Sequence, residues 1–217
     1  MVEIPLFPLN TVLFPGMPLR LHIFEERYKR MIQWCLSSGQ PFGVVLIRRG
    51  REALGPLAEP FSIGCTAKIT DLQRLGDGRM NLSGLGQERF RTLQLDRNAL
   101  PYLLGAIEPY PLLHDDPEAE QQSGQQLANW LRHYLGILNQ AGKEQLSPAE
   151  IPEDPVSLAY LAASLVQAPP LEKQRILSIG EASQLLSEVL ALFRREIAIL
   201  RALLLEQAEP KGSFSNN

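Results

Sequence analysis

The three histidines of the chain are the first residues to consider for metal or acid–base chemistry. They are His22, His114 and His133, and no two of them have the i, i+4 spacing that places a metal pair on one helix face. His114 precedes Asp115-Asp116, where turn and helix-entry chemistry explains the acidic cluster. We therefore expect no metal ligands, no catalytic residues and no cofactor, unless His22 or His133 meets an acid and a nucleophile across the fold.

Glycine-rich stretches could present a nucleophile or cradle a phosphate. Ser83-Gly84-Leu85-Gly86 lacks the G-x-S-x-G spacing that exposes a serine on a strained turn. The chain has no G-x-x-x-x-G-K-[S/T] sequence, and Gly86 leads into a strand pattern instead of the helix N-terminus that a nucleotide site needs. Turns and bulges explain these glycines, and the sequence predicts a protein that is not an enzyme.

Arginines could bind the phosphates of a nucleic acid. Arg48-Arg49-Gly50-Arg51 is a local basic cluster, and Arg89 and Arg91 are predicted to lie on one face of a strand. The whole chain has a net charge of −3, so it has no global attraction for nucleic acid or for anionic lipid. An RNA-associated module is therefore the alternative function, and we expect no membrane binding.

Aromatic residues crowd the N-terminal stretch PLFPLNTVLFPGMPLRLHIFEERY, which covers residues 5–28. Phe7, Phe14 and Phe24 are too many for a surface loop unless they pack inside the protein or face a partner. Core packing is the default interpretation, and a binding groove is the alternative.

Short strands separated by turn residues dominate the first half of the chain. Alternating apolar and polar residues, or short β-branched runs, predict strands around residues 19–23, 42–47, 65–70, 80–82, 90–95 and 102–107. One amphipathic helix interrupts them, from Tyr28 to a stop at Gly39. This pattern predicts an antiparallel barrel or sandwich with a helix covering one end.

Helical spacing replaces this alternation after Pro109-Tyr110-Pro111. Asp116-Pro117 and Asp154-Pro155 have the form of helix entries, and Ser178-Ile179-Gly180-Glu181 resembles a capping box that opens the longest helix. That helix is apolar on more than one face, which predicts either burial among the other helices or a homodimer through it. The residues beside its main seam are Leu185, Val189, Leu192, Ile199 and Leu203.

The bulk composition is that of a cytoplasmic protein. Of its 217 residues, 45% are hydrophobic, and no apolar run approaches the roughly 18 residues of a membrane span. The N-terminus has no signal-peptide pattern. Cys35 and Cys65 are far apart, with neither a disulfide framework nor a zinc spacing, so reduced thiols are expected.

Four stretches in order resemble one known family. They are similar to the N-terminal, substrate-binding domain of Lon proteases. In chain order they are the opening PLFPLNTVLFPGMPLRLHIFEERY, the segment GRMNLSGLGQERFR, the strand YLLGAIEPYP and the helical LAASLVQAPPLEKQRIL. The resemblance extends from about residue 3 to residue 205. It implies an α+β fold, in which a PUA-like β pseudo-barrel with one inserted helix precedes a C-terminal α-helical bundle.

The same resemblance implies the division of the chain. We expect a barrel at residues 1–113, a helical bundle at 114–208 and a disordered tail at 209–217. In the Lon proteases this domain precedes an ATPase module and a serine–lysine peptidase module. The chain has no phosphate loop and no length for a peptidase, so it resembles a standalone member without proteolytic activity.

The function that the resemblance implies is recognition of unfolded or apolar protein segments, in a cleft between barrel and bundle. A protease or a chaperone is the expected further partner. The residues expected to contact the segment are Phe14, Phe24, Tyr28, Arg89 and Phe90.

Overall fold

The computed structural model describes residues 2–53, 55–140 and 151–208. In these ranges a strand-rich part comes first: β1 (Val2–Leu9), β2 (Pro18–Ile23), α1 (Glu26–Ser38), β3 (Phe42–Arg49), β4 (Glu59–Arg74), β5 (Met80–Asp96) and β6 (Leu103–Pro109). Helices follow: α2 (Pro117–Gln140), α3 (Pro155–Leu165), α4 (Pro170–Leu177) and α5 (Ala182–Ala208). The prediction of strands first and helices second is confirmed, and the predicted tail at 209–217 lies outside the described residues.

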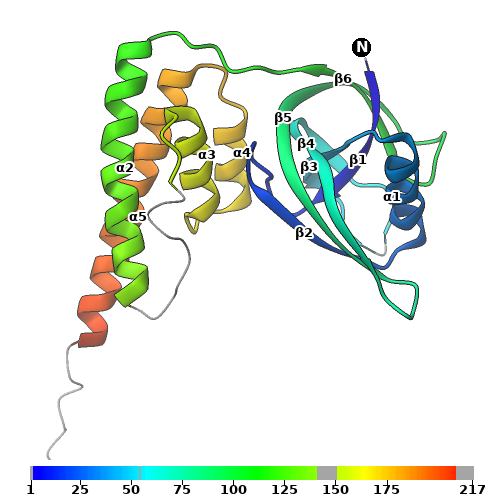
Figure 1. Cartoon of the computed structure of the whole chain (residues 1–217), viewed down its shortest axis with the longest axis horizontal. Coiled ribbons are helices and arrows are strands. Elements are labelled where there is room, and N and C mark those ends of the chain that lie inside the picture. The colour runs from blue at the N-terminus through cyan, green and yellow to red at the C-terminus, as the bar shows by residue number, and fades with distance from the viewer. Residues whose placement is uncertain (1, 54, 141–150, 209–217) are drawn as a thin grey trace, which may run out of the picture.

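The strands form one sheet that closes on itself. The order is β2-β5-β4-β3-β1-β6, and β5 also pairs with β6. The long strand β5 makes this closure possible, because β4 lies along one of its sides while β2 and then β6 pair with successive parts of the other. Figure 1 shows this curved sheet beside the helices.

The prolines of β1, Pro5 and Pro8, could be taken as signs of an edge strand, but β1 is not at an edge of the sheet. β1 lies inside the sheet, parallel to β3 and antiparallel to β6. Pro5 is paired only with β6 and Pro8 only with β3, so each proline has a neighbour on one side alone. A missing N–H is tolerated there, because the unpaired side requires no donor.

The turn between β1 and β2 is fastened to β5. The amide of Met17 donates to the carbonyl of Phe14 at 3.1 Å and closes a turn through Pro15 and Gly16. Gly16 has a φ of 75°, which favours glycine, and its amide donates to Gly86 of β5 at 2.9 Å. The turn is thereby held against the strand that carries Arg89.

The helix α1 covers one end of the barrel (Figure 1). Its buried side chains are Tyr28, Met31, Ile32 and Cys35, and Gly39 ends it in a left-handed conformation, as predicted. The ring of Tyr28 stacks on Phe7 of β1 with centroids 4.0 Å apart. The N-terminal aromatics therefore contribute to the core, apart from Phe24.

The helices α2, α3 and α5 pack together around a second core (Figure 1). Leu185, Val189 and Leu192 of α5 are buried in it, so packing within one molecule accounts for three of the residues that suggested a dimer. Ile199 is exposed. No helix in the described ranges is long and apolar enough to cross a membrane.

Candidate functional site

Three of the five predicted site residues are core residues. Phe14, Tyr28 and Phe90 are almost fully buried, and each belongs to a different hydrophobic cluster. The structure therefore does not bring the five residues to one surface. The prediction that they contact a protein segment stays a prediction, and burial leaves these three side chains only a supporting role in this conformation.

Phe24 is the exposed member of the set. It is 44% exposed, and the centre of its ring lies 6.4 Å from the centre of the His22 ring at the end of β2. A slot of about 250 Å³ separates this end of β2 from β1, and Phe24 and Tyr28 both line it. This slot is small for a protein segment, since ligand pockets usually measure about 300 Å³ or more.

Arg89 joins the barrel to the helices. Its side chain is only 5% exposed, and Nη1 donates hydrogen bonds to the carbonyls of Leu177, at 2.9 Å, and of Ile179. The hydroxyl of Tyr110 donates to the carbonyl between them, that of Ser178, at 3.1 Å. These carbonyls end α4, where a cation also complements the negative end of the helix dipole.

Two guanidinium groups stand close to the ring of Tyr110. The Arg89 and Arg91 side chains stand 4.9 Å and 4.6 Å from the centre of its ring. Burial lowers the pKa of Arg89, whose neighbours Tyr160 and Tyr110 oppose this shift. Burial likewise raises the pKa of Tyr160 to about 12, so its hydroxyl remains protonated.

A cleft of about 410 Å³ opens over this junction. We call it the interface cleft; its walls include Pro15, Tyr110, Leu112, Val156 and Tyr160, with Arg89 below. Behind it, Tyr160 stacks on Phe14 with centroids 5.9 Å apart. Nη2 of Arg89 is buried and has no hydrogen-bond partner within the described residues. The cleft thus offers walls that are mostly apolar, which suits an apolar protein segment.

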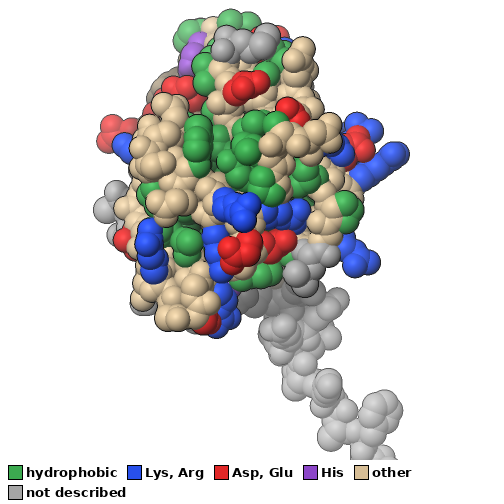
Figure 2. All heavy atoms as spheres, turned by 90° about the vertical axis from the view of Figure 1, so that its right-hand side faces the viewer, with side chains coloured by type: hydrophobic (Ala, Val, Ile, Leu, Met, Phe, Trp, Pro, Cys, Tyr) green, Lys and Arg blue, Asp and Glu red, His purple; other side chains and the backbone are tan. Residues whose placement is uncertain are grey.

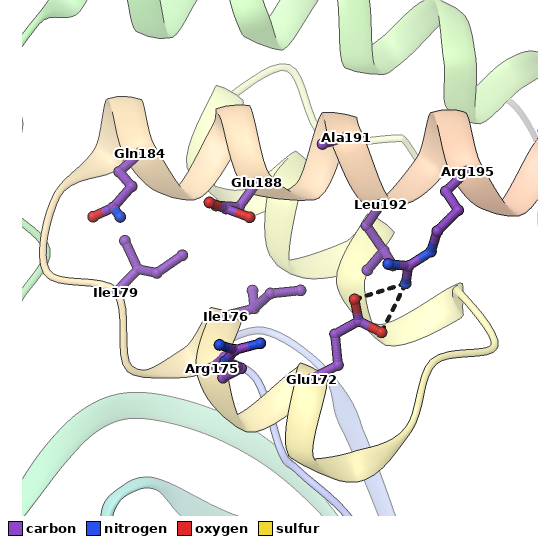
Figure 3. Close-up of a pocket in the computed structure, with 9 residues that line it drawn as sticks. All are labelled: Glu172, Arg175, Ile176, Ile179, Gln184, Glu188, Ala191, Leu192 and Arg195. Carbon is purple, nitrogen blue, oxygen red and sulfur yellow. Dashed lines mark hydrogen bonds and ion pairs between the residues drawn. The ribbon is translucent and has the colours of Figure 1, made fainter.

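A larger groove, of about 500 Å³, lies between α4 and α5 (Figure 3). Arg195 closes one end of it with hydrogen bonds of 2.6 and 2.8 Å to Glu172. Glu188 of α5 faces the groove, and the floor residues Ile176 and Leu192 are almost fully buried. This groove offers charged walls and little apolar surface, so it suits an unfolded segment less well than the interface cleft.

Three of the arginines that could bind phosphates have partners within the described residues. Arg89 is bound to α4, and Arg48 and Arg91 pair with Glu59 and Glu108. Figure 2 shows the face on which α1 lies, where basic side chains stand among acidic ones around a group of hydrophobic side chains. Among the described residues no group of three or more His, Cys, Asp or Glu side chains could hold a metal ion.

Sequence reasoning found Arg89 but missed Tyr110, Val156 and Tyr160. Tyr110 stands between two prolines where the strand pattern ends. This signal was interpreted as the boundary between strands and helices and not as part of a binding site. Val156 and Tyr160 are four positions apart on α3, so they share one helix face. That face could be assigned to a cleft only once α3 was placed against the barrel.

Comparisons with known proteins agree with this architecture. The chain is 29% identical to the Lon protease of Anaeromyxobacter dehalogenans over 215 residues, which cover 98% of this chain and 25% of that protein. A crystal structure of a Lon N-terminal domain protein from Xanthomonas campestris has a TM-score of 0.65 at 25% identity and covers 88% of this chain and 98% of its own. The N-terminal domain of a Mycobacterium avium complex Lon protease, at 15% identity and a TM-score of 0.70, covers 89% of this chain and 98% of its own and has the same fold.

The chain spans about a quarter of the length of the curated relatives it matches. The family model described as the ATP-dependent protease La (LON) substrate-binding domain matches residues 3–195. The resemblance found in the sequence is thereby confirmed, and the chain belongs to the family of Lon substrate-binding domains.

Proposed function

We propose that this chain is a non-catalytic recognition module that binds unfolded or apolar segments of proteins in the interface cleft. Its barrel at residues 1–113 is of the PUA-like type, and the helices at 114–208 form the accompanying bundle. It acts in the cytoplasm, and its partner is an ATP-dependent protease or a chaperone that takes over the segment it holds.

The observation that carries this proposal is the composition of the interface cleft. Tyr110, Tyr160 and Val156 provide apolar contact area between the barrel and the helices. Because apolar contact does not depend on one particular sequence, such walls suit segments of many unfolded proteins. Membership in a substrate-binding family supports the same function.

The predicted site residues take different parts in this proposal. Arg89 contacts the bound segment, and Phe14 supports the Tyr160 ring from behind. Phe24 and Tyr28 line the separate slot beside β2, where Phe24 offers a further apolar contact. Phe90 fills the barrel interior and keeps β5 in place.

Fluorescence anisotropy with labelled, unfolded casein tests the proposal, with labelled total RNA as the competing probe. We expect saturable binding of casein that changes little between low and moderate salt. Binding of RNA alone, lost at moderate salt, would instead favour the nucleic-acid alternative, since phosphate contacts depend steeply on salt.

A matched pair of variants locates the binding site. V156E places a carboxylate in the cleft wall, whereas S157E adds the same charge one position further on α3, at an exposed residue. We expect V156E to weaken casein binding about tenfold and S157E to leave it unchanged. Equal binding by both variants would exclude the cleft as the site.

A further inference from the structure

A second hollow adjoins the interface cleft. It has a volume of about 470 Å³ and lies between the C-terminal end of α1, β4 and β5. We call it the α1 hollow; Leu36, Pro41 and Ile69 form its apolar wall, and Lys68 and Glu88 also line it. Glu88 lines the interface cleft as well, so the two hollows meet at this residue.

An irregularity in β5 creates this meeting point. Between the pairs Cys65↔Arg89 and Ala67↔Gly86, two residues of β5 oppose one residue of β4. The hydroxyl of Thr66 fills the gap, donating to the carbonyl of Glu88 at 3.2 Å and accepting from its amide at 3.1 Å. As a result both Gln87 and Glu88 are exposed, where a regular strand would turn one of them inward.

The α1 hollow has apolar surface available for a ligand. Leu36 is 41% exposed, and Ile69 is half-buried. Exposed apolar side chains that gather at a hollow are typical of interaction sites. The carboxylate of Glu88 has no ion-pair or hydrogen-bond partner among the residues that the structure describes, so a negative charge remains unused between the two hollows.

We propose that the α1 hollow and the interface cleft together hold one extended protein segment, which has apolar side chains three positions apart and a basic residue between them over Glu88. This inference rests on the proposed function and specifies the class of segment that the chain selects.

The spacing follows from the arrangement of the strands. The α1 hollow extends over β4, and the interface cleft extends over the segment that follows β6. That segment lies beside β5, because the amide of Tyr110 donates to the carbonyl of Arg89. Two strand spacings separate these positions, roughly 10 Å. In the polyproline II conformation, residues i and i+3 lie on the same side about 9 Å apart. An extended segment therefore fills both hollows with side chains at i and i+3.

The position of the basic residue follows from the two charges. Lys68 lines the α1 hollow alone, whereas Glu88 lines both hollows. The side chain of a Lys or Arg between the two anchors projects to the side of the segment and is long enough to reach Glu88, whereas beyond the first anchor it lies closer to Lys68. The two placements are thus attractive and repulsive respectively.

Labelled peptides of about ten residues test the inference by anisotropy. The parent peptide has two leucines at i and i+3 with a lysine between them. One comparison peptide has the leucines at i and i+5, and another has glutamate in place of the lysine. We expect the parent to bind wild type about tenfold more tightly than either, and E88K to reverse the preference for lysine over glutamate.

Two matched variants test the α1 hollow itself. L36E should weaken binding of the parent peptide about tenfold, while S37E, with the same charge on the next and exposed residue, should not. If V156E abolishes binding but L36E, E88K and the leucine spacing have no effect, the inference is wrong and the proposed function stands. If neither casein nor any peptide binds, both are wrong.

Discussion

Arg89 of β5 donates a hydrogen bond of 2.9 Å to the backbone carbonyl of Leu177, 88 positions further along the chain. Both groups are removed from water, and the bond ties the closed sheet to the end of α4. Gln174 of α4 adds a second tie, because its amide donates to the carbonyl of Ile63 at 3.0 Å. The walls of the interface cleft are therefore fixed relative to one another.

Removing the Arg89 side chain should destabilise the whole chain. R89A leaves the carbonyls of Leu177 and Ile179 without these donors, and a lost charged hydrogen bond together with unsatisfied buried groups costs about 3 kcal/mol. Urea unfolding followed by circular dichroism measures this loss. R91A is the control, since Arg91 is exposed and, within the described residues, pairs with Glu108 and contacts the Tyr110 ring; it should cost about 1 kcal/mol or less. Equal losses in the two variants would contradict this role of Arg89.

The N-cap of α3 positions Val156 and Tyr160. The carboxylate of Asp154 accepts from the amide of Ser157 at 2.8 Å, as the Asp154-Pro155 pattern predicted. D154A should lower the free energy of unfolding by about 1 kcal/mol, and D154S should retain most of it, because serine is also a good N-cap. An unchanged midpoint in urea for D154A would show that this cap does not contribute.

Stability should fall slightly as pH rises past neutrality. Nδ1 of His114 lies 2.8 Å from Oε2 of Glu120, and this hydrogen bond raises the pKa of His114 above 6.5. Because the pKa of His114 is higher in the folded than in the unfolded state, His114 adds its full contribution to stability below the unfolded-state pKa. This contribution is lost as the pH rises through the folded-state pKa. Thermal unfolding at about pH 6 and pH 8 should show a larger decrease for wild type than for H114Q. An equal decrease in the stability of wild type and H114Q would show that His114 does not cause it.

The thiols should be unreactive in the folded protein. Burial raises the pKa of both Cys35 and Cys65 to about 12, and the thiolate is the reactive form. At about pH 8 a maleimide should label neither residue in the native state and both in urea. Labelling in the native state would show that the barrel core opens.

The sequence predicted most of the elements because their signals are local. The helix from Glu26 to Ser38 and the entries at Asp116 and Asp154 follow from residues close together in the chain, and the structure confirms them. Periodicity also predicted strands before helices but left a barrel or a sandwich open; the family resemblance implied the barrel, and the sheet does close on itself.

Features that depend on distant residues were not predictable. Ser178-Ile179-Gly180-Glu181 was interpreted as a capping box, which is wrong, because Ser178 instead ends α4 and its hydroxyl donates to the carbonyl of Gln174 at 2.7 Å. The N-terminus of α5 is capped by Asp115, 68 positions earlier, which accepts from the amide of Ser183 at 3.1 Å. The interface cleft has the same origin, since it exists only where α3 meets the barrel.

The most direct test of the central claim is site-specific crosslinking in the interface cleft. Because the native thiols should not react, V156C and S157C can each be labelled with a benzophenone maleimide and irradiated with unfolded casein. Binding in the cleft predicts strong crosslinking from position 156 and little from position 157, suppressed by an excess of unlabelled casein. Equal or absent crosslinking at both positions would contradict the claim that the cleft between barrel and helices holds the segment.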